Sequence, residues 1–169
     1  MEKIIFLDID GVLNVIGMHC GPRDEFGSQF HTHLVDNLRY IIEQTGASIV
    51  ISSSWRMSGL GQMKLMWEMR DLPGEVIETT PWAGEVVNAG GPFHSETMCR
   101  GEEIQYWLDR TSNVRYVIID DDNDMLEIQK SNFVRTAENW DHAGHVEGYG
   151  LTRECAARAV EILNKPTGT

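Results

Sequence analysis

The sequence has few cysteines, few positive charges and no long apolar run. Its 169 residues hold three scattered cysteines, none in a CxxC pair: Cys20, Cys99 and Cys155. This odd number without metal-ligand spacing argues against a disulfide framework and a thiolate metal site, so we expect reduced thiols in a cytoplasmic protein. The apolar runs have only strand length, so we expect neither a signal peptide nor a membrane span, and no membrane partner.

Positive charge is scarce relative to negative charge. Lysine and arginine number 14 against 26 aspartates and glutamates, which gives a formal net charge of −12. Such a surface repels polyanions, so tight sequence-independent binding to long nucleic acid is disfavoured. Action on a nucleic-acid end stays open, because part of the negative charge lies in an acidic cluster that a metal ion would offset.

The chain also lacks internal repeats, linkers and low-complexity tracts, and we expect one domain over residues 1–169. Short apolar runs alternate with amphipathic segments, which predicts an α/β fold with a doubly wound parallel sheet. The expected strands are Ile4–Leu7, Ala47–Ser52, Glu75–Thr79, Val114–Ile119 and Phe133–Thr136. The expected helices are Thr32–Thr45, Leu60–Leu72, Gly101–Arg110 and a last helix that Thr152 caps and that runs to Leu163.

One long connection interrupts this alternation, from Thr80 to Cys99, with at most a short strand around Val86 and Val87. Connections of this length are uncommon in compact domains and often form lids or binding loops. We therefore expect a loop insertion at 80–99 near the site and facing the substrate. Its Trp82 and Phe93 either stack on a base or pack the loop onto the domain.

Two of the expected strands end in clustered acids. The first is followed by Asp8 and Asp10, and the fourth by Asp120, Asp121, Asp122 and Asp124. Ligands of open α/β sheets sit at the carboxyl ends of the strands, so both clusters would meet at the expected ligand site. Carboxylates about 4 Å apart repel by about 4 kcal/mol at an effective dielectric constant of about 20, so the cluster needs a cation. Hard oxygen ligands with room for water and a phosphate favour Mg²⁺.

Polar residues at two further positions suggest phosphate contacts. The strand at Ala47–Ser52 leads into Ser53 and Ser54, of which Ser54 suits a helix cap while Ser53 is open between capping and binding. Arg56 is placed to clamp a phosphate bidentately. Arg100 stands at a helix start, where a cation gains nothing from the helix dipole, so its charge serves another purpose.

Some polar residues are expected to have only structural roles. The spacing of His31 and His33 differs from that of a zinc-binding pair on a helix, and we expect both at the surface. Asp124 is expected to cap the short helix that follows it.

Together these segments resemble the haloacid dehalogenase-type (HAD) phosphohydrolases. FLDIDGVLN resembles motif I, IVISSSWR motif II, RGEEIQYWL motif III and YVIIDDDND motif IV. The resemblance implies the strand order 5-4-1-2-3 with motifs I, II and IV at the carboxyl edge. Neither insertion is long enough to form a large cap domain.

The resemblance also implies roles for individual residues. Asp8 matches the nucleophile and Asp10 the general acid and base. Ser52 matches the hydroxyl that binds the phosphoryl group, and Arg100 the motif III cation, with Lys64 and Arg115 as rivals. Gly11, Ser53 and Arg56 would contact the substrate. The metal ligands would come from Asp8, Asp10, Asp120 and Asp121, with Asp121 favoured over Asp120.

Across nearly its full length the chain resembles a capless HAD subgroup of RNA-repair and polynucleotide kinase-phosphatase systems. This implies a Mg²⁺-dependent phosphatase for a terminal phosphate, above all at a 3′ end of RNA or DNA, with a repair kinase or ligase as partner. A nucleotide or other small-molecule phosphatase is the alternative that the acidic surface favours. A phosphoprotein substrate stays open. A non-catalytic HAD-fold binding module is a further alternative, disfavoured because every motif keeps a chemically competent residue.

Overall fold

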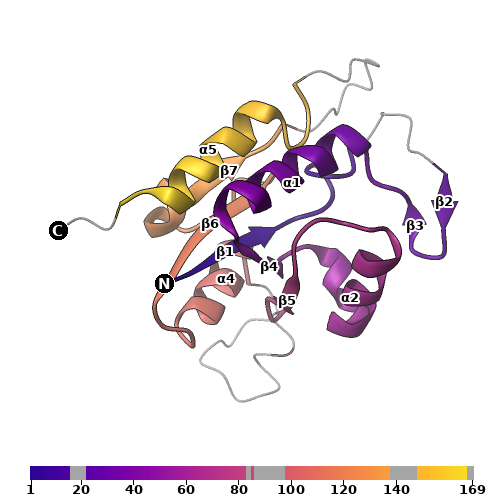
Figure 1. The fold of residues 1–169 in the computed structure, drawn as a ribbon. Helices are drawn as coiled ribbons and strands as arrows, with labels where there is room; N and C mark the ends of the chain where they lie inside the picture. The colour runs from indigo at the N-terminus through magenta and orange to yellow at the C-terminus, as the bar shows by residue number, and fades with distance from the viewer. Residues whose placement is uncertain (16–21, 83–84, 86–97, 138–147, 167–169) are drawn as a thin grey trace.

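The computed structural model describes residues 1–15, 22–82, 85, 98–137 and 148–166 (Figure 1). Its centre is a parallel sheet in the order β5-β4-β1-β6-β7. If these five strands are numbered 1 to 5 along the chain, their order read from the β7 edge is 5-4-1-2-3. The predicted topology is therefore confirmed. The sheet strands are β1 (Glu2–Leu7), β4 (Ser48–Ile51), β5 (Val76–Thr79), β6 (Val114–Asp120) and β7 (Phe133–Arg135). A small antiparallel hairpin, β2 (Arg23–Asp24) and β3 (Gly27–Ser28), projects to one side.

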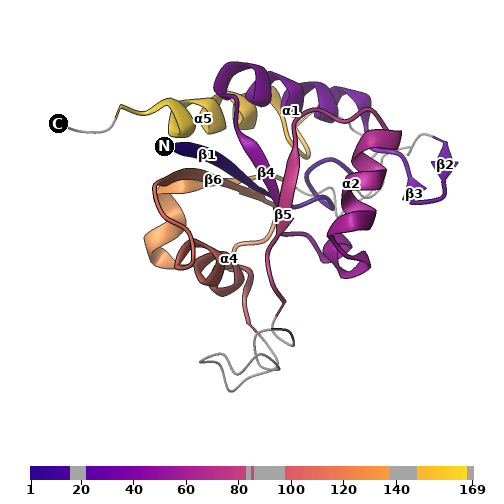
Figure 2. The ribbon, with the colours of Figure 1, turned by 60° about the horizontal axis from the view of Figure 1, so that its bottom comes forward.

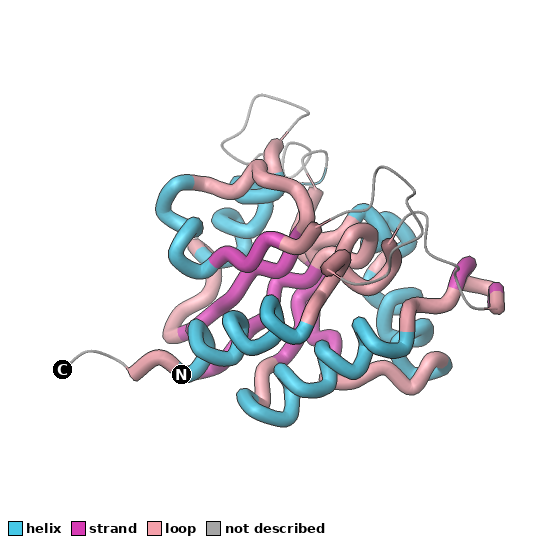
Figure 3. Tube along the Cα trace, turned by 90° about the horizontal axis from the view of Figure 1, so that it is seen from above, coloured by secondary structure: helices cyan, strands magenta, loops and turns pink. Residues whose placement is uncertain are grey.

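Helices cover both faces of this sheet, as Figures 2 and 3 show. The cluster of α1, α2 and α5 packs on one face, and α4 packs on the other. The doubly wound prediction is therefore confirmed. The helices are α1 (Thr32–Thr45), α2 (Leu60–Met69), α4 (Arg100–Leu108) and α5 (Arg153–Asn164), with 3₁₀ turns η1 (Ser54–Ser58) and η2 (Glu127–Asn132).

The first strand forms the middle of the core. Ile4 to Leu7 are fully buried. Alternate side chains of a strand point to opposite faces, and accordingly Ile5 and Leu7 pack on the α1 side while Ile4 and Phe6 pack on the α4 side. The apolar run is continuous because both faces of the strand are covered by helices.

The element boundaries follow local sequence signals closely. Helix α1 matches the predicted range and ends at Gly46, whose φ of 65° is left-handed. Helix α2 ends at Met69 instead of the predicted Leu72, because the chain already turns at Asp71, where φ is 49°. The strand expected around Val86 and Val87 lies outside the described residues.

Three expectations about polar residues were wrong. His31 is buried and precedes α1 directly, so it is not a surface residue. The cap of η1 is Ser53, whose hydroxyl accepts from the amide of Trp55, and not Ser54. Asp124 does not cap the turn that follows it: its carboxylate accepts from the amide of Arg100 at 2.9 Å and so caps α4.

No helix among the described residues is long and apolar enough to cross a membrane. Cys99 and Cys155 are free thiols, as predicted, whereas Cys20 lies outside the described residues.

Candidate active site

The parallel pairing brings three predicted site residues to one edge of the sheet. Leu7 is in register with Ile51 of β4 and Ile119 of β6. The pairing continues one residue further, because the amide of Asp8 donates to Ile119 at 3.0 Å and the amide of Ser52 to Leu7 at 3.0 Å. Asp8, Ser52 and Asp120 therefore leave neighbouring strands side by side, as the sequence predicted.

Asp8, Asp120 and Asp121 form a cluster of carboxylates. Each offers an oxygen within 4.8 Å of the others. Asp8 and Asp120 are buried, with 7% and 1% of their surface exposed. Burial, and then the charge of Asp8, raise the pKa of Asp120 to about 8. Burial also raises the pKa of Asp8, against the lowering effects of the Ser53 hydrogen bond and the Arg100 charge.

Arg100 is the predicted cation that reaches this cluster. Its Nε lies 3.5 Å from Asp120 Oδ2, which makes an ion pair without a hydrogen bond, since that oxygen has no hydrogen-bond partner among the described residues. The two rivals lie elsewhere. Lys64 is exposed on α2, and Arg115 stands near the opposite end of β6, where its guanidinium donates to the carbonyl of Leu163.

The first two serines after β4, Ser52 and Ser53, form a buried turn, which we call the serine turn. Ser52 and Ser53 have no exposed surface. The Ser53 hydroxyl caps η1 and acts to lower the pKa of Asp8. The Ser52 hydroxyl finds no partner among the described residues, although a buried unpaired hydroxyl is costly. The Ser52 hydroxyl, on the strand next to the one that Asp8 follows, is therefore a candidate to bind a substrate oxygen.

Arg56 and Glu103 form a buried ion pair behind this turn. The Arg56 Nη2 lies 2.7 Å from Glu103 Oε2, and its Nη1 donates to the carbonyls of Ser52 and Ser53 at 2.9 and 2.8 Å. Glu103 Oε2 also lies 3.2 Å from Arg100 Nη1. Both Nη atoms of Arg56 thus contact protein acceptors, so a bidentate phosphate clamp through them would require Arg56 to leave these acceptors.

Glu103 was missed in the sequence, although its spacing from Arg100 gave a usable signal. Residues three apart on a helix lie on the same face, so an acid at this position can hold Arg100 from within α4. Burial raises the pKa of Glu103 even though Arg56 and Arg100 act to lower it. Burial likewise lowers the pKa of Arg56. Burial of the charged forms of Glu103 and Arg56 therefore costs desolvation free energy.

The carboxylate of Asp10 points to two neutral donors. Its Oδ2 accepts from the indole Nε1 of Trp55 at 2.8 Å, and its Oδ1 accepts from the side-chain Nδ2 of Asn14 at 2.9 Å. Asp10 is exposed and does not belong to the cluster of three carboxylates. Sequence reasoning missed both donors, and the Trp-Arg pair after the serine run was the available signal for Trp55.

Gly11 shapes the turn between Asp10 and the rest of the chain. Its φ is 74°, a conformation that favours glycine. Its amide donates to the Asn14 carbonyl at 2.7 Å, and its carbonyl accepts from the buried hydroxyl of Thr136 at 2.7 Å. The motif I turn is thereby fixed to the segment that follows β7.

The strand order, the helices on both faces and the acids at the carboxyl edge define a HAD-type domain. The model of a family described as "HAD domain in Swiss Army Knife RNA repair proteins" matches residues 4–140. The chain belongs to this family. Neither a curated protein nor a solved structure matches it.

Proposed function

We propose that this protein is a Mg²⁺-dependent phosphomonoester hydrolase that removes a terminal phosphate, above all a 3′ phosphate, from a nucleic-acid end. The observation that carries the proposal is the buried Asp8 carboxylate at the sheet edge, surrounded by the Ser53 hydroxyl, the Arg100 charge and two further acids. Membership of a family from RNA-repair proteins supports a phosphatase-type function.

The cluster of three carboxylates fits a magnesium ion. Its oxygens are close enough to share one ion, and Asp120 Oδ2 is buried without a hydrogen-bond partner among the described residues. Asp8, Asp120 and Asp121 would hold the ion, with Asp121 as the favoured ligand. When bound, Mg²⁺ would offset the repulsion among these acids and the charge on the phosphate oxygens. The carboxylate of Asp10 is better suited to acid–base chemistry, because Trp55 and Asn14 hold it outside this cluster.

Asp8 would act as nucleophile and Asp10 as acid and base. A carboxylate oxygen of Asp8 attacks phosphorus and forms an aspartyl-phosphate, while the bond to the leaving oxygen breaks and Asp10 gives that oxygen a proton. A water then attacks phosphorus, Asp10 takes its proton, and the bond to Asp8 breaks to release inorganic phosphate. The Ser52 hydroxyl and Arg100 would stabilise the charge on the transferring group.

The substrate is proposed to be large because no large cap domain is expected to enclose it. The connections after β5 and β7 are too short for a large cap domain, and the described residues include no second folded unit over the sheet edge. A nucleotide or other small-molecule phosphatase is the second candidate. The net charge of −12 favours it, because this charge opposes the approach of a long polyanion.

The test is phosphate release from a matched panel with and without Mg²⁺. The panel holds an oligonucleotide phosphorylated at the 3′ end, one phosphorylated at the 5′ end, mononucleotides, a phosphopeptide and p-nitrophenyl phosphate. Preference for the 3′ end supports an end-healing enzyme that would work beside a repair kinase or ligase. Preference for mononucleotides supports the second candidate. No release from any substrate, with metal bound, would contradict both and favour a binding module.

A further inference from the structure

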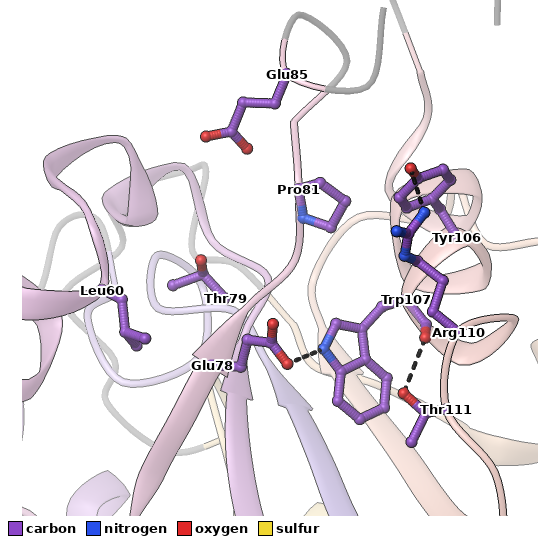
Figure 4. A pocket seen from close by; sticks show the side chains of 9 residues that line it. All are labelled: Leu60, Glu78, Thr79, Pro81, Glu85, Tyr106, Trp107, Arg110 and Thr111. Carbon is purple, nitrogen blue, oxygen red and sulfur yellow. Dashed lines mark hydrogen bonds between the residues drawn. The ribbon is translucent and has the colours of Figure 1, made fainter. Parts of the chain in front are cut away.

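A pocket of about 520 Å³ lies between β5 and α4 (Figure 4). Tyr106 of α4 and Arg110, just after that helix, line one side. Glu78 of β5 and Pro81, just after that strand, line the other, and Glu85 lies at the upper end. None of these residues has a role in the proposed reaction. The volume lies in the range of small-ligand sites, which are typically several hundred cubic ångströms.

Of the two elements that enclose this pocket, α4 carries a site residue and β5 ends next to the strand that leads to Ser52. Strand β5 ends beside β4, because the amide of Thr80 donates to the Ile51 carbonyl at 2.9 Å, one residue before Ser52. Helix α4 begins with Arg100. Neighbouring strands lie about 4.8 Å apart, so the end of β5 is roughly 10 Å from the end of β1, which Asp8 follows. A nucleotide whose phosphate is at Asp8 can bridge such a separation.

The α4 side of the pocket offers a planar surface. The guanidinium carbon of Arg110 lies 4.9 Å from the centre of the Tyr106 ring, and its Nη1 donates to the Tyr106 hydroxyl at 2.7 Å. Aromatic rings and guanidinium planes are the groups on which proteins stack single-stranded bases. The indole of Trp107 adds a fixed wall, because its Nε1 donates to Glu78 at 2.7 Å.

The opposite side favours a base over a phosphate. Glu78 and Glu85 bring carboxylates, which repel phosphate but accept hydrogen bonds from the exocyclic amines of bases. The net charge of −12 also leaves little general attraction for a polyanion. An acidic protein that acts on a nucleic-acid end therefore needs contacts with the base itself.

We propose that this pocket binds the nucleobase at the phosphorylated end, with the base stacked on Tyr106 and Arg110. This inference rests on the proposed function, since it places the phosphate of the same substrate at Asp8. The base belongs either to a strand end or to a free nucleotide, and these two sources share the chemistry that the pocket recognises.

The test compares Tyr106→Leu with a matched control. Leucine keeps much of the bulk of the half-buried Tyr106 but removes the aromatic face and the hydroxyl. The control is Tyr40→Leu, because Tyr40 of α1 also lies under an arginine, with Arg153 3.3 Å from its ring centre, but on the other face of the sheet. Arg110→Met, at an exposed position, is a second test variant should Tyr106→Leu fold poorly.

The substrates are a 3′-phosphorylated oligonucleotide, a nucleoside 3′-phosphate and p-nitrophenyl phosphate, which carries no base. We expect Tyr106→Leu to raise the KM for both base-carrying substrates by about 10-fold, the usual scale for loss of one stacked base. The KM for p-nitrophenyl phosphate should stay unchanged, and Tyr40→Leu should change neither. An effect on both supports the proposal, whereas an effect on the oligonucleotide alone would contradict it, because the nucleoside 3′-phosphate carries the same terminal base.

Failure of this inference differs from failure of the proposed function. A wild-type protein that hydrolyses p-nitrophenyl phosphate, with variants that change all substrates equally or none, contradicts the base pocket alone. A wild-type protein that hydrolyses nothing contradicts the proposed function. Calorimetric titration with adenosine and cytidine then still tests the pocket: binding that Tyr106→Leu abolishes supports it, and no binding to the wild-type protein refutes it.

Discussion

Glu103 offers the sharpest test of how the site is held together. One buried carboxylate oxygen contacts Arg56 at 2.7 Å and Arg100 at 3.2 Å. Through Arg56 it is linked to the carbonyls of Ser52 and Ser53. Glu103 therefore joins the serine turn to the cation of motif III. Burial raises the pKa of Glu103 by more than the two arginines lower it. We therefore infer that the ion pairs of Glu103 with Arg56 and Arg100 maintain the geometry of the site more than they stabilise the fold.

The expected magnitudes follow from the burial of this network. Glu103→Ala leaves the Arg56 charge buried without its partner, which typically costs about 3–5 kcal/mol of unfolding free energy. Glu103→Gln keeps the shape and one acceptor, so we expect a loss of about 1.5–3 kcal/mol. Arg100 loses its charged tether in both variants. The kcat should fall by about 10- to 100-fold, as expected when a catalytic group is displaced by about 1 Å.

Urea unfolding and phosphatase kinetics measure the two effects separately. The matched control is Glu161→Gln, because Glu161 pairs with Arg158 at 3.1 Å with the same helical spacing but at the surface. This control should lose less than about 0.5 kcal/mol and keep its kcat. The reasoning is refuted if Glu103→Gln is as stable and as active as Glu161→Gln. A variant that loses stability but keeps the wild-type kcat, while folded, would limit Glu103 to a structural role.

Three further changes test other parts of the structure. Trp55→Phe removes a donor that orients Asp10, so we expect about a 10-fold fall in kcat for an alkyl phosphate. The kcat for p-nitrophenyl phosphate should change little, because its leaving group needs no acid. Equal losses on both substrates would argue against this role of Trp55. Arg70 holds the pKa of Asp24 below its usual range, so this pair stabilises the protein above about pH 4 and loses its effect as the pH falls through the lowered pKa. The difference between wild type and Asp24→Asn in urea unfolding should therefore be full at about pH 6 and shrink as the pH falls below about 4, and a constant difference would contradict the assignment. Gly101→Ala would place a Cβ 2.5 Å from a backbone nitrogen, so we expect a loss of at least about 1–3 kcal/mol by thermal unfolding, and an unchanged Tm would show that the helix start can shift.

The fold could be predicted because its signals are local. Four apolar residues before Asp8 predicted a strand buried on both faces, and the spacing in Thr32–Thr45 with Gly46 predicted α1 to the residue. The meeting of Asp8 with Asp120 followed from topology alone, since parallel strands deliver their carboxyl ends to one edge.

The fine structure of the site could not be predicted in the same way. Trp55 reaches Asp10 across 45 positions of sequence, and the contact depends on the path of η1. The same turn directs the guanidinium of Arg56 onto the carbonyls before it, a contact that residue type and proximity to the serines do not reveal. Asp124 caps a helix that precedes it in the chain, because the packing of α4 against this loop decides which amide is nearest.

The central claim is that Asp8 receives the phosphoryl group, and acid-quench trapping tests it most directly. The best substrate of the panel, radiolabelled in its phosphate, is mixed with Mg²⁺ and the protein, quenched, and digested for peptide mapping. We expect label on the peptide that contains Asp8, and none in Asp8→Asn, which should stay folded while turnover falls by at least about 10³-fold. Full turnover by Asp8→Asn, or label on another residue, would contradict the account.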